Sequence, residues 1–496
     1  MARRKKAPAV PTAPDAAMNL QDAPVLDTAP DLTLLSERLD AVEAFGGQMS
    51  QAIESLVDAV VGLQTQVNPE DETDAAGLAA LTARVAALEQ QSRLAAACTD
   101  LATTSRFHQK TRSVVFVGTS YFGCNVKYAW LAFRAQARAA GIQTWFLPQT
   151  AQQVEAVTGL DEACFPLKAS DWGPEHITAA LSAAVVVTCD HLLNPNPYAA
   201  SLLAGARHVQ LWHGISIKEI GLRNLAPLKN MTPQFARVLA TCGPFTRMVG
   251  TSGSQEGEFR RWFGFERYAP IGYPRNDVLL REPDAADLLN VDMVVLAEAR
   301  AARAAGRRVV LYAPTFRNAK RGSWIIEAGL ETLAAQLARR GDVLIINMHP
   351  VESPMIPQLV QALPTARFVT PRTDIYPLLR EASVLITDYS SVMFDYLLLD
   401  RPVLLFRPDH QDYITKSRQL FDDKLEAKPG PLASDVAGLL SLLKPYDAHG
   451  PEFAPNRAAL RGRLFDHVDG GAGERFASLL LEELDLALDS AQGECP

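Results

Sequence analysis

The 496-residue sequence predicts an α/β protein in which two doubly wound parallel-sheet domains face a cleft, preceded by a coiled coil. Short apolar runs alternate with helical patterns, this alternation occurs twice, and a heptad repeat of apolar residues precedes both halves. The 48% hydrophobic content and a length sufficient for about three domains agree with this class. The six cysteines contain no Cys-x-x-Cys pair, so neither a disulfide framework nor a zinc site is predicted.

The N-terminal 1–30 segment is rich in Ala, Pro and Asp, which predicts a disordered tail. Its basic residues Arg3, Arg4, Lys5 and Lys6 could contact anionic lipid, although a solvated tail explains them more simply. No apolar core follows them, so they are not a secretory signal. The net charge of -8 argues against a nucleic-acid binder, and no apolar run approaches the ~20 residues needed to span a bilayer. We therefore expect a cytoplasmic protein, with peripheral contact at the inner face of the membrane as an open alternative.

The segment 31–105 carries the pattern of a coiled coil. Apolar residues recur at alternating steps of three and four from Leu35 to Val67 and again from Leu78 to Leu88. A helix packed on its own domain would give a similar pattern, but such helices seldom run this long without a broader apolar face. We expect this segment to join copies of the chain into a homo-oligomer and to carry no chemistry.

Two successive segments predict the parallel-sheet domains, 112–285 and 286–490. In the first, the predicted strands are the short apolar runs 113–118, 144–147, 184–187 and 209–212. In the second, they are 309–312, 343–347, 367–369, 384–386 and 403–406. Ligands of such sheets bind beyond the carboxyl ends of the strands, so the residues that follow each strand are the candidate site.

Residues 382–407 show this organisation most clearly. The buried run 384–386 is followed by the hydroxyl-rich turn 387–391, and a helical pattern then extends from Val392 to the break at Asp400-Arg401-Pro402. Small hydroxyls and backbone N–H groups at a helix start bind phosphate well. An ordinary strand-to-helix turn would also show these residues, and this stretch alone does not separate the two.

A histidine follows one strand in each half. His213 and Gly214 come directly after the run that ends at Trp212, and His349 follows the run that ends at Asn347. One such histidine is commonly structural, but two that face the predicted cleft favour a function. Histidine is the side chain best placed to exchange protons near neutral pH.

Five motifs at these strand ends resemble the signature set of the CDP-glycerol glycerophosphotransferase family, which includes wall teichoic acid polymerases and related capsule-building enzymes. They are 211–221 (LWHGISIKEIG), 272–277 (GYPRND), 312–317 (YAPTFR), 348–350 (MHP) and 387–395 (TDYSSVMFD). Each motif alone is weak, but all five occur in the family's order and at predicted strand ends or the interdomain turn. The resemblance extends over roughly 113–484 and omits the predicted coil.

The resemblance implies a glycosyltransferase-B-like architecture of two Rossmann-like domains. It also implies transfer of a polyol phosphate from CDP-glycerol or a related CDP-polyol to a hydroxyl of a glycan or polyol-phosphate acceptor, which includes lipid-linked acceptors. The expected setting is synthesis of a teichoic-acid-like or capsule polymer. No cofactor is implied beyond the CDP-glycerol substrate. The sequence contains no Asp-x-Asp pair, so we expect no protein-bound metal.

The resemblance also suggests residue roles. His213 would take the proton of the acceptor hydroxyl and His349 would contact the donor phosphate, although the two roles could be exchanged. The residues expected to bind the donor diphosphate are Gly214, Thr315, Arg317, Thr387, Asp388, Ser390, Ser391 and Asp395. Those that either contact the donor or form an interdomain turn are Arg275, Asn276 and Asp277. Weaker candidates for the acceptor side are Thr119, Ser120 and Asn125.

The sequence departs from the family pattern at three places, and these bear on the substrates. Ile215-Ser216 stands where Thr-Pro is usual, Asn318 where an acid is common, and Asn347 where a basic residue often stands. The polyol, the acceptor and the number of additions therefore stay open. Two other classes also stay open: a nucleotide-sugar hexosyltransferase of the same fold, and a non-catalytic assembly subunit of a capsule machine.

Overall fold

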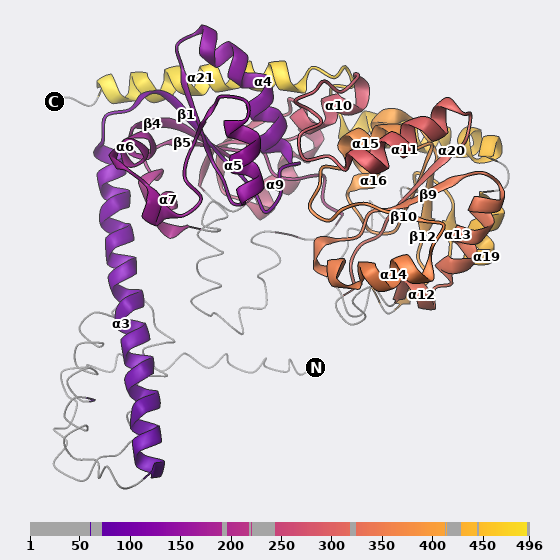
Figure 1. Cartoon of the computed structure of the whole chain (residues 1–496). Coiled ribbons are helices and arrows are strands. Elements are labelled where there is room, and N and C mark those ends of the chain that lie inside the picture. Colours follow the sequence, from indigo (N-terminus) through magenta and orange to yellow (C-terminus); the bar gives the residue numbers. More distant parts are fainter. Residues whose placement is uncertain are drawn as a thin grey trace, which may run out of the picture. The chain divides into compact units, whose positions relative to one another are not determined.

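The computed structural model describes residues 60, 72–190, 196–217, 220, 244–317, 324–411, 413, 428–443 and 446–493. The chain divides into two compact units, Met1–Ala95 and Ala96–Pro496, and the second contains two parallel sheets (Figure 1). The predicted α/β class with two all-parallel sheets is thus confirmed. The predicted disordered tail and most of the predicted coiled coil lie outside the described residues.

The first sheet has the strand order β3-β2-β1-β4-β5-β6-β7. Its strands are β1 (Thr111–Val117), β2 (Gln143–Leu147), β3 (Ala163–Cys164), β4 (Ala183–Thr188), β5 (Arg207–Gln210), β6 (Phe245–Val249) and β7 (Phe265–Ala269). Its helices are α4 (Asn125–Ala139), α5 (Ala151–Thr158), η2 (Ala169–Asp171), α6 (Pro174–Ser182), α7 (Pro197–Leu202), η5 (Gly253–Gln255) and α9 (Glu256–Trp262). The central strands β1 and β4 contain the continuous buried apolar runs 114–117 and 183–187, as expected of parallel strands covered on both faces.

The second sheet has the strand order β10-β9-β8-β11-β12-β13. Its strands are β8 (Val309–Ala313), β9 (Val343–Ile346), β10 (Arg367–Phe368), β11 (Val384–Thr387), β12 (Val403–Phe406) and β13 (Leu432–Ala433). Its helices are α11 (Met293–Ala304), α12 (Trp324–Glu327), α13 (Leu330–Arg339), η7 (Pro350–Met355), α14 (Ile356–Ala362), α15 (Tyr376–Glu381), α16 (Val392–Tyr396), η8 (Leu397–Leu399), α19 (Val436–Leu442) and α20 (Tyr446–Leu464). Between the two sheets lie η6 (Pro274–Asn276) and α10 (Asp277–Leu280).

Each sheet reverses its strand order at one point, between β1 and β4 in the first sheet and between β8 and β11 in the second. At such a reversal the connections on the two sides lead away from each other, which leaves room for a ligand beyond the carboxyl ends of the strands. The loop that follows β11 is the 387–391 turn, so the stretch singled out from the sequence lies at the reversal of the second sheet.

Strands β6 and β7 were not predicted, because each carries an arginine among its apolar residues. Arg247 and Arg267 both donate to Oε1 of Glu483, at 2.8 and 3.0 Å, and the Glu483 carboxylate is fully buried. Glu483 lies on α21 (Ala472–Gly493), far along the chain. Since this partner neutralises the arginines in the fold, strands that look too polar in sequence can pair at the end of the sheet.

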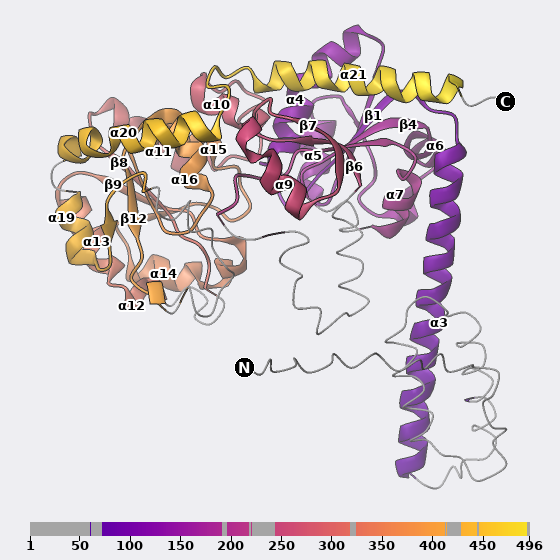
Figure 2. The ribbon, with the colours of Figure 1, turned by 180° about the vertical axis from the view of Figure 1, so that it is seen from behind.

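The last helix, α21, packs against the first half of the chain. It lies along α4 and also contacts β1 and β4, and the views from both sides show this arrangement (Figures 1 and 2). The sequence interpretation had assigned 286–490 to the second domain. After α20, however, the chain passes back to the first sheet, where its final helix α21 packs against α4, β1 and β4.

Apart from Val60, the described part of the predicted coiled coil is one helix, α3 (Glu72–Phe107). Its side chains Leu81, Val85 and Leu88, which were predicted to form the seam, are buried within the single chain. A helix packed within its own chain would bury these side chains as well, so the structure adds no support for a coiled coil. Among the described residues, no helix combines the length and apolar character needed to cross a bilayer.

Candidate active site

The loop that carries His213 follows β5 and has an unusual backbone. Trp212 has φ 53°, in the left-handed region where a bulky residue is rarely found, and Gly214 has φ 145°. Two side chains hold this backbone: Asn125 Nδ2 donates to the Trp212 carbonyl, and the Trp212 N–H donates to Gln210 Oε1, both at 2.9 Å. A strained backbone persists only where its surroundings fix it, and such residues cluster at functional sites.

The His213 ring is exposed and is oriented by the end of β4. Its Nδ1 lies 3.1 Å from the carbonyl oxygen of Cys189, and the Trp212 ring packs against it at a centroid distance of 4.0 Å. Because a carbonyl oxygen can only accept, Nδ1 carries the proton of the neutral ring. The lone pair of His213 is therefore on Nε2, the nitrogen that can take up a proton.

Cys189 also forms a disulfide with Cys124, which precedes α4. The sequence predicted no disulfide framework, since the two residues are 65 positions apart and form no spacing motif. The structure differs because β1 and β4 are neighbours in the sheet, so the residues that follow them come together. The bridged Cys189 is the residue whose carbonyl binds His213.

The Ser390–Ser391 loop follows β11, and both serines are half-buried. The preceding Thr387 is fully buried and donates to the Ala313 carbonyl at 2.7 Å, so it ties β11 to β8 and does not face the loop. From the first half of the chain, Gly214 lies against this loop: a Cβ placed on it would be 3.2 Å from Ser391 Oγ. The loops that carry His213 and Ser391 therefore meet, and this tight approach together with the φ of 145° favours glycine at position 214.

Asp395, on α16, bonds to neighbours other than the serine loop. Its buried carboxylate accepts from Arg275 Nη2 at 2.8 Å, Asn276 Nδ2 at 3.1 Å and the Tyr376 hydroxyl at 2.7 Å. Burial would lower the pKa of Arg275, but Tyr376 and Asp395 raise it above its usual value, so the guanidinium stays charged. Arg275 and Asn276 thus bond across the two halves of the chain, as the interdomain alternative of the sequence prediction would require.

α16 itself is short, with five residues before it tightens into η8. A helix of little more than one turn aligns few peptide dipoles, so its N-terminus attracts an anion less than the sequence pattern suggested. The hydroxyls of Ser390 and Ser391 are the more substantial donors of this loop.

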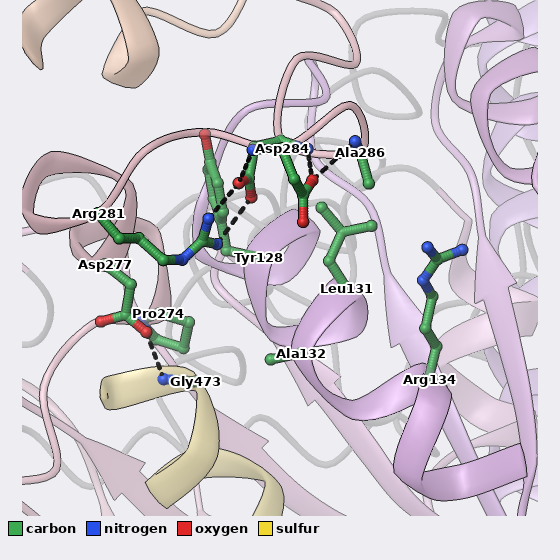
Figure 3. Close-up of a pocket in the computed structure, with 11 residues that line it drawn as sticks. Tyr128, Leu131, Ala132, Arg134, Pro274, Asp277, Arg281, Asp284, Ala286 and Gly473 are labelled. Atoms are coloured by element: carbon green, nitrogen blue, oxygen red, sulfur yellow. Dashed lines mark hydrogen bonds and ion pairs between the residues drawn. The ribbon is translucent and has the colours of Figure 1, made fainter. Parts of the chain in front are cut away.

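Asp277 supports the start of α21. Its carboxylate accepts from the backbone N–H groups of Ala472 at 3.0 Å and Gly473 at 2.7 Å, and Figure 3 shows it pointing toward Gly473. Burial raises the pKa of Asp277, although these two hydrogen bonds oppose the rise. The cavity beside it, of about 190 Å³, is lined by neither of the two histidines nor by the Ser390–Ser391 loop. Asp277 therefore has a structural position.

Arg317 is buried and paired within the second half. Its Nε and Nη2 donate to Asp409 at 2.7 and 3.0 Å, and its Nη1 lies 2.8 Å from Asp388 Oδ2. The guanidinium also lies over the rings of Trp324 and Tyr413. A phosphate contact of the kind expected from the sequence would compete with these interactions, so the structure gives Arg317 the position of a support beneath the loop.

His349 follows β9 and is exposed. Its Nδ1 accepts from the Val351 N–H at 3.2 Å, so the proton of the neutral ring is on Nε2. The Phe316 ring packs against it at 4.6 Å, and the adjacent Thr315 donates through its N–H and hydroxyl to Asp388 Oδ1 at 2.9 and 2.8 Å. These contacts connect His349 to the start of the Ser390–Ser391 loop.

The predicted strand-end residues thus form two groups. Those exposed or half-buried at the meeting loops are His213, His349, Ser390 and Ser391. Those buried beneath them and bonded to other protein groups are Thr315, Arg317, Thr387, Asp388 and Asp395. Sequence reasoning missed Gln210, Asp409 and Tyr376, which hold the loops in place but follow no motif. In the part of the chain that is described, no three His, Cys, Asp or Glu side chains could hold a metal ion, and the metal-free site stays a prediction.

Comparison with known proteins identifies similar chains. The family model of CDP-Glycerol:Poly(glycerophosphate) glycerophosphotransferase matches residues 108–482. A teichoic acid poly(glycerol phosphate) polymerase of Staphylococcus epidermidis is 29% identical over 288 residues, 56% of this chain. A teichoic acid ribitol-phosphate primase of Bacillus spizizenii is 26% identical over 297 residues, 57% of this chain. The matches cover 39% and 71% of these relatives, so the chain spans only part of each.

A solved structure of the wall teichoic acid polymerase TagF, in a variant with a histidine replaced by asparagine, has the same fold. It superposes with a TM-score of 0.62 at 21% identity, and the match covers 81% of this chain and 99% of that one. At this identity the similarity concerns the fold, and it agrees with the predicted glycosyltransferase-B-like arrangement of two parallel sheets.

Proposed function

Because the chain belongs to the CDP-Glycerol:Poly(glycerophosphate) glycerophosphotransferase family, we propose that it transfers glycerol phosphate, or a related polyol phosphate, from a CDP-activated donor. The acceptor is a hydroxyl of a glycan or of a poly(glycerol phosphate) chain, and CMP is released. The setting is the synthesis of a teichoic-acid-like or capsule polymer. The polyol is left open, since a similar relative is named for ribitol phosphate.

The observation that carries this proposal is that Nδ1 has opposite hydrogen-bond partners in the two exposed histidines, a carbonyl oxygen for His213 and an N–H group for His349. His213 has its lone pair on Nε2, because its Nδ1–H binds the Cys189 carbonyl. His349 has its proton on Nε2, because its Nδ1 accepts from the Val351 N–H. One ring is therefore prepared to accept a proton and the other to donate a hydrogen bond, which are the two tasks of phosphate transfer to a hydroxyl.

In the proposed reaction, the acceptor oxygen attacks the phosphorus of the glycerol phosphate group. Its proton moves to His213 Nε2, and the bond from this phosphorus to the oxygen that bridges to CMP breaks, with the electron pair leaving on CMP. His349 Nε2–H and the hydroxyls of Ser390 and Ser391 donate to the phosphate oxygens as charge moves onto the leaving group. The buried Thr315, Arg317, Thr387, Asp388 and Asp395 serve by holding these loops.

The test is incubation of the full chain with CDP-glycerol, CDP-ribitol or UDP-sugars together with a glycan or poly(glycerol phosphate) acceptor. We expect CMP release and a product heavier by one or more polyol phosphates in mass spectrometry. Release of UDP with a hexose added to the product would instead identify a hexosyltransferase. Absence of turnover with every donor, despite nucleotide binding, would identify a non-catalytic subunit. The proposal includes no metal or cofactor, so EDTA is expected to leave CMP release unchanged.

Self-association through the N-terminal segment and peripheral contact with a membrane are further parts of the proposal. They rest on the sequence pattern of 31–105 and on the basic residues near the N-terminus. Light scattering of the full chain is expected to give the mass of a homo-oligomer. Co-sedimentation with anionic phosphatidylglycerol vesicles, but not with neutral ones, is expected for membrane contact. A monomeric chain that co-sediments with neither kind of vesicle would contradict self-association and membrane contact, but not the proposed transfer reaction.

A further inference from the structure

The Arg275 guanidinium joins the His213 loop to the helix that follows the serine loop. Its Nη1 donates to the His213 carbonyl oxygen and its Nη2 to Asp395 Oδ2, both at 2.8 Å. The Arg275 side chain is 4% exposed and the Asp395 side chain 1% exposed, so water competes little for either bond. A single planar cation therefore binds the backbone beside one exposed histidine and a carboxylate four residues after Ser391.

Both ends of this connection are themselves fixed. Asp395 also accepts from Asn276 Nδ2 and from the Tyr376 hydroxyl, so its carboxylate has little freedom to rotate. At the other end, the Arg275 backbone N–H lies 3.4 Å from Asn125 Oδ1, and Asn125 Nδ2 donates to the Trp212 carbonyl. The carbonyl groups on both sides of the His213 N–H are thus held by one connected set of hydrogen bonds.

The packing around Gly214 shows how close the two loops come. A Cβ on Gly214 would lie 3.1 Å from Arg275 Nη2 and 3.2 Å from Ser391 Oγ. Trp212 stays at φ 53°, a conformation that a tryptophan would leave if its neighbours allowed it. Loss of the bond to the His213 carbonyl would therefore let this loop relax and move the imidazole with it.

We propose that Arg275 is a positioning residue for the transfer reaction, which fixes the His213 imidazole relative to the Ser390–Ser391 loop through the His213 carbonyl and Asp395. This proposal rests on the proposed function, because it makes Arg275 the side chain that sets the distance between the base His213 and the donor phosphate. A misplacement of about 1 Å of a catalytic group can lower a rate by about 10²-fold, so the contribution is measurable in kcat.

A second buried ion pair provides a matched control. Lys127, on α4, bonds to Asp374 Oδ2 at 2.7 Å, and both side chains are 0% exposed. Lys127 also donates to the carbonyls of Asp287 and Leu289 at 2.7 Å, so it connects α4 to the second half as firmly as Arg275 does. The hydrogen bonds and ion pairs described for Lys127 do not involve His213. Its replacement therefore serves as the control for a lost connection between the halves, since Lys127 makes no direct hydrogen bond to His213 or to Asp395 among those described.

The experiment compares Arg275→Gln and Lys127→Gln, each in the wild-type chain and in a His213→Asn background. Arg275→Gln is expected to lower kcat for CMP release by about 10- to 100-fold, with KM for CDP-glycerol changed by less than about threefold. In the His213→Asn background, Arg275→Gln is expected to lower kcat little further, because the imidazole that Arg275 positions is absent. Any loss caused by Lys127→Gln should be the same in both backgrounds.

Arg275→Lys provides a second variant in case the glutamine variant does not fold. A lysine keeps the charge beside Asp395 but cannot bind both acceptors in the same plane, so an intermediate kcat is expected. Hydrogen exchange supplies a readout independent of activity: amides of 211–217 should exchange faster in the Arg275 variants than in Lys127→Gln. Failure of the wild-type chain to release CMP would contradict the proposed function. Hydrogen exchange at 211–217 would still test whether Arg275 holds the His213 loop, because it does not depend on activity. Equal fold-losses in both backgrounds, or unchanged exchange at 211–217, would overturn the positioning role.

Discussion

Replacement of His213 by asparagine is expected to lower kcat for CMP release by about 10²- to 10⁴-fold, the usual effect of losing a general base. The asparagine amide can still donate to the Cys189 carbonyl, as Nδ1 does at 3.1 Å, so the loop is expected to keep its conformation. The variant lacks the Nε2 lone pair and also the ring that packs on Trp212. Because the lost interaction forms during the reaction, KM for CDP-glycerol is expected to change little. Steady-state assays of CMP release measure both constants.

His467→Asn serves as the control, since His467 is exposed and lies in the turn before α21. It is expected to retain wild-type kcat. His349→Asn gives the complementary comparison, and a rise in KM for CDP-glycerol is expected there, because His349 is assigned to the donor phosphate. If His213→Asn kept full kcat while His349→Asn lost it with donor binding intact, the two roles would be exchanged.

Replacement of Arg317 by glutamine is expected to reduce the free energy of unfolding by about 3–5 kcal/mol. This change leaves the carboxylates of Asp388 and Asp409 without their buried cation, and an uncompensated buried charge is the costly result of breaking such a pair. The midpoint of urea unfolding measures the effect. The result matters for the site, because it distinguishes a buried support from a residue that contacts phosphate.

Arg367→Gln is the matched control for this effect. Arg367 pairs with Glu298 at 2.6 Å, but the two side chains are 46% and 40% exposed. Exposed pairs contribute only about 0–1 kcal/mol, so a small change in the midpoint is expected. A stable Arg317→Gln protein whose KM for CDP-glycerol rises strongly would show that Arg317 leaves its partners to bind the donor, as the sequence resemblance suggested.

The strands buried on both faces were predictable from sequence, and the strands next to α21 were not. The run 403–406 was predicted with the bounds that β12 has, because a central parallel strand shows an uninterrupted apolar run. β6 and β7 contain Arg247 and Arg267, whose charges are compensated by the buried Glu483 of α21. A partner more than 200 positions away leaves no local pattern, so neither these strands nor the return of α21 could be read from periodicity.

The loops of the candidate site were predictable, whereas the division of roles within them was not. An arginine at a strand end looks like a phosphate ligand, but Arg317 is occupied by Asp409, 92 positions further along the chain. Asp395 looked like a neighbour of the serine loop by helical spacing, yet its carboxylate is 120 positions from its partner Arg275. Sequence spacing identifies which residues share a turn. Which of them face the substrate depends on long-range partners that appear only in the fold.

The histidine tautomers are the central claim, and nitrogen NMR of the full chain with ¹⁵N-labelled histidine measures them directly. Signals are assigned by their loss in His213→Asn and His349→Asn, at a pH where both rings are neutral. We predict that His213 carries its proton on Nδ1 and His349 on Nε2. A His213 ring protonated on Nε2, or the same tautomer in both rings, would contradict the assignment of base and phosphate contact.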